Sequence, residues 1–172
     1  YGQLLAETGQ LELSLEVFQQ LLAENPYDTS LHYAAGTISL NLNMPRQALD
    51  YFSTVLQHGY DDPSIYYFMG RSFLLLNQHT TARQHFLSVE SGPQLMASQL
   101  ELLHFYLEKH PDGNIDAFFA QRRLALPQAS AKLYHLEADF SLRQENTIAA
   151  AIAYNTGLSH HPDNIALLYG RA

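Results

Sequence analysis

The sequence contains no cysteine, few charged residues and no long apolar run. Without cysteine there are no disulfides, no thiolate metal sites and no cysteine catalysis, but the absence fits either a reducing or an oxidising compartment. No stretch reaches the roughly 18 consecutive apolar residues that a membrane-spanning helix requires, so we expect no membrane insertion by these residues. No signal peptide is visible either, and that absence does not settle the location.

Basic residues are scarce as well. Charged residues make up 15% of the chain, with 17 acids against nine bases, and only Lys109 and Lys132 are lysines. The resulting net charge of -8 repels phosphate backbones, so we expect no nucleic-acid partner. Hydrophobic residues make up 47% of the 172 residues, which is enough for a folded core and argues against disorder.

What the sequence does contain is a 34-residue repeat. The eighth place of successive repeats holds Gly2, Gly36, Gly70, His104, Ala138 and Ala172. The twentieth holds Ser14, Ala48, Ala82, Asp116 and Ala150, and the twenty-fourth holds Phe18, Phe52, Phe86, Ala120 and Tyr154. Small residues at the first two places allow two helices to approach closely. An aromatic residue four positions after the second small one lies on the same helical face and fills the adjacent gap.

Pro26 and Pro162 share the thirty-second place. This pattern of small residue, alanine, aromatic residue and inter-repeat proline resembles the tetratricopeptide repeat family along the whole chain. The resemblance implies an all-α fold, a single right-handed superhelical solenoid of antiparallel helix pairs spanning residues 1–172. The expected repeats are 1–28 (partial), 29–62, 63–96, 97–130 (degenerate), 131–164 and 165–172 (partial). We expect 11 helices, at 1–8, 11–24, 29–42, 46–57, 63–76, 80–90, 94–109, 114–125, 130–144, 147–160 and 164–172, with Asp28, Asp62 and Asp163 favouring the helix starts that follow them.

The fourth repeat departs from the pattern. His104 and Asp116 stand where small residues are expected. A one-residue insertion near Pro111-Asp112-Gly113 would place Ala117 in the small position instead. The chain also opens at the seventh place of one repeat and stops at the eighth place of another, so we expect a longer parent protein and end-to-end association through open ends. A short native protein with frayed ends is the alternative.

In the family, the second, fifth, ninth, twelfth and thirteenth places of each repeat face a concave groove. The resemblance therefore makes the following residues candidates for partner binding: Tyr33, Thr37, Asn41, Tyr67, Arg71, Leu74, Phe105, His135 and Asp139. Tyr33 and Tyr67 occupy the same place, so they should lie along one wall and suit an extended or helical peptide, although packing against neighbouring helices would explain them equally. A subclass of the family binds carboxylate termini with Lys and Asn at the fifth and ninth places, and those residues are absent here.

The sequence shows no motif for catalysis, metal binding or a cofactor. The nine histidines form no H-E-x-x-H motif, and the adjacent His160 and His161 point in different directions on a helix. Glu101 and Glu108 could share a helical face, but we interpret them as a solvated groove edge. The sequence also contains no phosphate-binding glycine loop and no nucleophile elbow.

The leading interpretation is a non-enzymatic scaffold or adaptor that binds a protein or peptide. Runs such as Tyr1-Gly2-Gln3-Leu4-Leu5 and His58-Gly59-Tyr60 look like those of bacterial envelope tetratricopeptide proteins. That resemblance implies a periplasmic adaptor for a protease or for envelope assembly, anchored by a segment outside these residues; a cytoplasmic location is the alternative. A helical regulatory region of a larger enzyme and a self-association module remain open as other functions.

Overall fold

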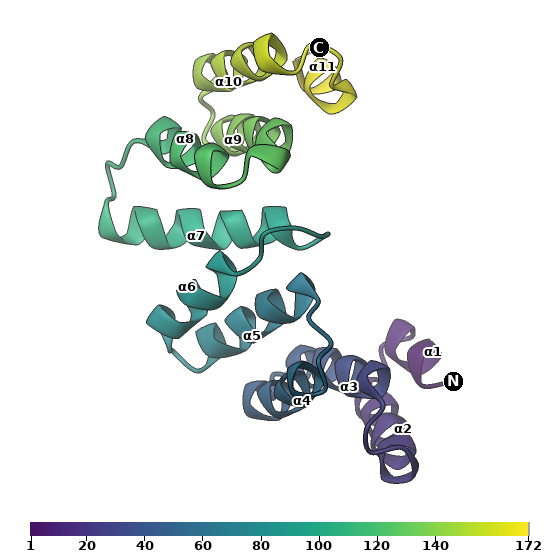
Figure 1. The fold of residues 1–172 in the computed structure, drawn as a ribbon. Helices are drawn as coiled ribbons and strands as arrows, with labels where there is room; N and C mark the ends of the chain where they lie inside the picture. The colour runs from purple at the N-terminus through teal and green to yellow at the C-terminus, as the bar shows by residue number, and fades with distance from the viewer. Residues whose placement is uncertain (172) are drawn as a thin grey trace. The chain divides into compact units, whose positions relative to one another are not determined.

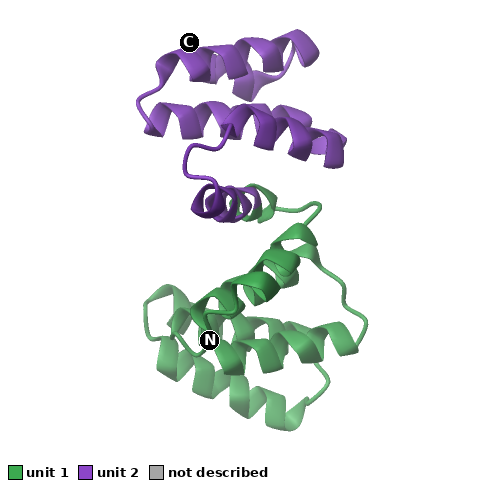
Figure 2. Cartoon of the chain, turned by 90° about the vertical axis from the view of Figure 1, so that its left-hand side faces the viewer, with its two compact units in different colours: residues 1–98 green, residues 99–172 purple. Residues whose placement is uncertain are grey.

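The computed structural model describes residues 1–171, which form helices and no strand (Figure 1). The helices are α1 (Gly2–Glu7), α2 (Leu11–Glu24), α3 (Thr29–Asn41), α4 (Pro45–Gln57), α5 (Pro63–Leu75), α6 (His79–Leu87), α7 (Leu95–Lys109), α8 (Ile115–Ala125), the 3₁₀ turn η1 (Pro127–Ala129), α9 (Ser130–Arg143), α10 (Thr147–His160) and α11 (Ile165–Arg171). The chain divides into two compact units, unit 1 (residues 1–98) and unit 2 (residues 99–172), coloured separately in Figure 2. The expected helices are confirmed in number and, within a few residues, in position.

Local signals in the sequence set the helix starts. The Asp28 carboxylate accepts hydrogen bonds from the backbone N–H groups of Ser30 and Leu31, at 2.9 and 3.1 Å, and so caps α3. The Asp62 carboxylate caps α5 by accepting one hydrogen bond, from the backbone N–H of Ser64 at 2.7 Å. Capping side chains satisfy N–H groups that the first turn of a helix leaves without a partner. At α11 it is Asn164, rather than the expected Asp163, whose side chain accepts from the N–H of Leu167.

The repeat columns form the core contacts of unit 1. A Cβ atom added to Gly36 would lie 2.8 Å from the Phe52 ring, and one added to Gly70 would lie 2.7 Å from the Phe86 ring. Gly2 stands in the same relation to Phe18, at 2.9 Å. The glycine at the eighth place is therefore required by the aromatic ring at the twenty-fourth. Both Phe52 and Phe86 are fully buried in this arrangement.

The turn within each helix pair repeats as well. The residue at the fifteenth place adopts positive φ in four repeats, with values of 81° at Gly9, 58° at Asn43, 57° at Asn77 and 59° at Glu145. The next residue then donates its N–H to the carbonyl five positions back, at 2.8 to 2.9 Å. This is the Schellman motif, in which a left-handed residue ends a helix and satisfies its last carbonyls.

Pro111 occupies the fifteenth place of the fourth repeat, and its ring fixes φ near −65°. The left-handed turn is therefore impossible there, and the connection is longer. The repeat would start α8 at Gly113, 34 residues after His79, but α8 starts at Ile115, capped by Asn114. The displacement is two residues rather than the one we expected.

Because of this displacement, and contrary to our expectation, Ala117 does not occupy the small position of the fourth repeat. Ala117 is exposed, while the neighbouring Phe118 and Phe119 are buried. Phe118 packs against the Tyr106 ring, with 5.4 Å between centroids. His104 is exposed, so the glycine-to-aromatic contact of the first three repeats is replaced here by packing of larger rings.

The left-handed position of Glu145 provides a stability prediction. Glu pays a steric penalty at φ 59° that Asn and Gly avoid. We expect Glu145→Asn to stabilise the protein by about 0.5–1 kcal/mol, measured by urea unfolding followed by circular dichroism. The matched control is Gln144→Asn, one residue earlier at φ -90°, which should give no gain. Equal effects at the two positions would contradict this explanation.

Candidate functional site

The candidate partner-binding residues of unit 1 lie on the first helices of two consecutive pairs. We call this surface the aromatic face of unit 1, and it comprises Tyr33, Thr37 and Asn41 of α3 with Tyr67, Arg71 and Leu74 of α5. Spacings of three and four residues place each set on one side of its helix. Asn41 and Arg71 are exposed and the other four are half-buried.

Both tyrosines of this face pack against phenylalanines, of which Phe52 and Phe86 are fully buried and Phe68 is half-buried. Tyr33 contacts Phe52 and Phe68 edge-on, with ring centroids 6.2 and 6.0 Å apart. Tyr67 contacts Phe68 at 5.4 Å and Phe86 at 5.9 Å. Because Phe68 touches both tyrosines, one continuous set of rings runs from α3 to α5. The packing interpretation of the tyrosines is thus correct for one side of each ring, while the half-buried state leaves another side accessible.

Polar contacts order the rest of the aromatic face. Arg71 donates from Nη1 to the Tyr67 hydroxyl at 3.2 Å, and its guanidinium carbon lies 6.0 Å from the centre of that ring. The hydroxyl of Thr37 donates to the Ala34 carbonyl at 2.8 Å. Burial raises the pKa of the Tyr33 hydroxyl, and a hydrogen bond with Ser64 opposes this effect. Tyr33 is therefore a neutral hydrogen-bonding group at physiological pH.

A cavity of about 320 Å³ opens beside Tyr33 in unit 1. Its lining comes from α1, α3 and the α4–α5 connection, and consists of Gln3, Thr29, Ser30, Tyr33, Ala34, Tyr60 and Asp62. Two aromatic side chains, one carboxylate and several small polar groups therefore meet at one end of the aromatic face. Such a mixture can hold a side chain of a bound peptide.

The candidate partner-binding residues of unit 2 differ in their exposure and contacts. His135 and Asp139 are half-exposed and pair at 3.1 Å, and Asp139 also accepts a hydrogen bond from the Tyr154 hydroxyl at 2.9 Å. Burial, reinforced by the Asp139 carboxylate, raises the pKa of Tyr154 to about 12. Phe105, by contrast, is only 8% exposed. Its ring is therefore largely covered by the rest of the chain, and its role in partner binding stays a prediction.

Unit 2 also contains a buried ion pair that the sequence did not reveal. Arg123 of α8 donates to the Glu137 carboxylate of α9, and the guanidinium lies 4.0 Å from the centre of the Tyr134 ring. The Glu137 side chain is 5% exposed and that of Arg123 is 14% exposed. Burial raises the pKa of Glu137 to about 7, although the charge and hydrogen bond of Arg123 act in the opposite direction.

This raised pKa predicts a pH-dependent stability. Between about pH 4.5 and 7 the folded protein retains a proton on Glu137 that the unfolded chain has released. The free energy of unfolding should therefore fall by about 2–3 kcal/mol as the pH rises through this window, and then level off. Glu137→Gln should remove this slope, and subtracting its profile from that of the wild type cancels the histidine contribution. A difference profile that rises with pH would contradict the assignment.

Residues 1–171 contain no group of three or more His, Asp or Glu side chains placed to hold a metal ion. Within the same residues, none of the helices combines the length and the apolar character needed to cross a bilayer.

No protein-family model and no curated protein matches the chain. Solved structures do match. They include YrrB, described as a tetratricopeptide-repeat protein with an unusual peptide-binding site, at 19% identity and TM-score 0.55, covering 99% of this chain and 88% of that one. A repeat protein from Cytophaga hutchinsonii matches at 18% identity and TM-score 0.57, covering 100% and 71%. MamA matches at 11% identity and TM-score 0.58, covering 92% and 86%.

These similarities agree with the repeat columns and the helix order. The chain has the fold of tetratricopeptide-repeat proteins, an all-α array of helix pairs.

Proposed function

We propose that the chain is a non-catalytic scaffold that binds a segment of a partner protein along the aromatic face of unit 1. The observation that carries this proposal is the position of Tyr33 and Tyr67. Each ring packs against one fully buried and one half-buried phenylalanine and is itself half-buried, so part of it remains exposed. Rigid, partly exposed aromatic rings are favoured as binding anchors because little conformational entropy is lost when a partner covers them.

The charge of unit 1 favours a basic partner segment. Residues 1–98 contain no lysine and only three arginines, Arg46, Arg71 and Arg83, against nine acidic residues. Asp62 lines the cavity beside Tyr33, whereas Arg71 lies beside Tyr67. A bound segment would therefore place an apolar or aromatic side chain against the tyrosines and a cationic group near Asp62. The peptide-binding site described for YrrB is consistent with such a role on this fold.

The test removes both anchor rings. Tyr33→Ala with Tyr67→Ala should reduce capture of the partner from an extract of the native host by at least about ten-fold. The matched control is Tyr27→Ala with Tyr169→Ala, which deletes two rings that are 75% and 80% exposed, and it should capture as the wild type does. Circular dichroism and sedimentation establish that each variant is folded and has an unchanged oligomeric state. Undiminished capture by the folded Tyr33/Tyr67 variant would place the binding site elsewhere.

We further propose an adaptor in the bacterial envelope, which brings a substrate to a processing protease or assists envelope assembly. The support for this setting is the likeness of short runs, such as Tyr1-Gly2-Gln3-Leu4-Leu5 and His58-Gly59-Tyr60, to envelope repeat proteins. Fractionation of the native host with an antibody against this chain tests it. Recovery with periplasmic or outer-membrane markers supports the setting, and recovery with cytoplasmic markers contradicts it.

A further inference from the structure

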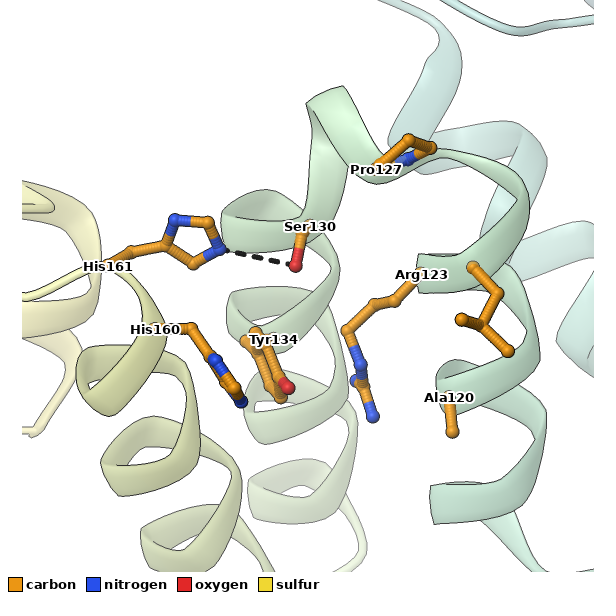
Figure 3. Close-up of a pocket in the computed structure, with 8 residues that line it drawn as sticks. Ala120, Arg123, Pro127, Ser130, Tyr134, His160 and His161 are labelled. Atoms are coloured by element: carbon orange, nitrogen blue, oxygen red, sulfur yellow. Dashed lines mark hydrogen bonds between the residues drawn. The ribbon is translucent and has the colours of Figure 1, made fainter.

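Unit 2 contains a cavity of about 560 Å³ that shares no residue with the candidate partner-binding positions (Figure 3). It is bounded by α8, by η1, by the start of α9 and by the end of α10. The eight residues that line it are Ala120, Arg123, Leu124, Pro127, Ser130, Tyr134, His160 and His161.

Tyr134 organises the polar side of this cavity. In Figure 3 its ring lies between His160 and Arg123. The His160 ring is stacked on it at a 5.9 Å centroid distance and a 14° interplanar angle, while the Arg123 guanidinium carbon is 4.0 Å from the ring centre. The Arg123 guanidinium therefore places a positive charge next to the electron-rich ring. The positions of His160 and Arg123 are set by packing before any ligand arrives.

The other polar side chains that line the cavity are also hydrogen-bonding groups rather than acids. His161 exchanges a hydrogen bond with the Ser130 hydroxyl at 3.2 Å, and its ring also contacts Tyr134. The residues that line this cavity include an arginine, two histidines and a serine but no Asp or Glu. Glu137 lies behind Arg123 rather than among the lining residues, and it orients the guanidinium by accepting from Nη1. In a chain of net charge -8, this is a local concentration of donors for an anion.

The apolar side of the cavity distinguishes it from a site for a free inorganic ion. Leu124 is 85% exposed at the edge, and Pro127 and Ala120 continue the apolar surface. A small hydrated anion gains nothing from this surface. A carboxylate attached to an apolar side chain or backbone segment would contact both parts at once, since arginine and carboxylate form charge-assisted hydrogen bonds.

We propose that this cavity is a second binding site, which takes the carboxylate of a partner peptide together with an adjoining apolar residue. Arg123 binds the carboxylate, His161 and Ser130 add hydrogen bonds, and Leu124 with Pro127 covers the apolar neighbour. The carboxylate comes either from a Glu side chain or from a chain terminus, and the two sources share the same chemistry.

The experiment uses the whole chain and four short peptides. These are Ac-Gly-Leu-Leu with a free carboxylate, the same peptide as its amide, Ac-Gly-Leu-Glu-amide and Ac-Gly-Leu-Gln-amide, with inorganic phosphate as a fifth probe. Binding is followed by NMR through the ring protons of His160 and His161. We expect one or both carboxylate peptides to shift these signals with a Kd of about 1 mM, and their uncharged counterparts to bind at least about ten-fold more weakly. Which carboxylate peptide binds identifies the source.

Variants separate binding from folding. Arg123→Met combined with Glu137→Leu removes the anion donor without leaving a buried charge, and it should weaken carboxylate binding at least about ten-fold. The matched control is Arg143→Ala, an exposed cation at the other end of α9, which should leave the affinity unchanged. Absence of any shift with both carboxylate peptides would overturn the proposal. So would phosphate binding as tightly as the peptides, since the apolar wall would then contribute nothing.

Discussion

Replacing Glu137 with leucine should destabilise the protein by about 3 kcal/mol, because the largely buried Arg123 guanidinium then loses its carboxylate partner. The Arg123 side chain is only 14% exposed, so water cannot replace the lost partner fully. The contact with the Tyr134 ring is retained, and for this reason we expect a value near the lower end of the usual range for broken buried pairs. Urea unfolding followed by circular dichroism measures the loss.

The double variant Arg123→Met with Glu137→Leu tests the cause. Two apolar side chains of similar volume need no charge partner, so we expect the double variant to unfold within about 1 kcal/mol of the wild type. The difference between the single and double variants gives the energetic coupling of the pair. If the double variant is as unstable as Glu137→Leu alone, the pair itself is stabilising and the unpaired cation does not explain the loss.

Replacing Phe52 with alanine should cost about 3–5 kcal/mol in unit 1. The ring is fully buried, and it lies against Gly36, Tyr33 and Phe68. Its removal leaves a cavity that Gly36 has no side chain to fill. Because Phe52 also supports Tyr33, we expect the same variant to weaken partner capture even under conditions where it remains folded.

Two further variants show whether the loss of stability in Phe52→Ala comes from the buried ring. Leu124→Ala removes a side chain that is 85% exposed and should change stability by less than about 0.5 kcal/mol. Phe52→Leu retains most of the buried apolar volume and should cost clearly less than Phe52→Ala. A small effect of Phe52→Ala would show that the glycine-to-aromatic column is not the main packing contact of the repeat.

The sequence predicted the helices well because the signals for them are local. The glycine at the eighth place and the aromatic at the twenty-fourth repeat at 34 residues, and the structure places Gly36 against Phe52 and Gly70 against Phe86. The fifteenth place of the repeat carries a further local signal. Gly9, Asn43 and Asn77 share the fifteenth place and are residues that tolerate a left-handed backbone, so Pro111 at that place indicates an altered turn.

The candidate sites were less predictable because they depend on contacts between distant positions. Arg123 and Glu137 are 14 residues apart on different helices, and each alone would be expected at the surface. Phe105 occupies a groove place by register, yet the two-residue displacement of α8 accompanies its burial. The adjacent His160 and His161 both reach Tyr134, because the helix ends at His160 and the chain turns there.

Site-specific photo-crosslinking tests most directly whether a partner lies on the aromatic face of unit 1. A photoreactive phenylalanine analogue placed at Thr37 or Arg71, one at a time, should crosslink a partner protein in the native host. The same analogue at Arg83 or Gln84, exposed positions on α6, should crosslink none or far less. Crosslinks confined to the α6 positions, with none from α3 or α5, would contradict the account.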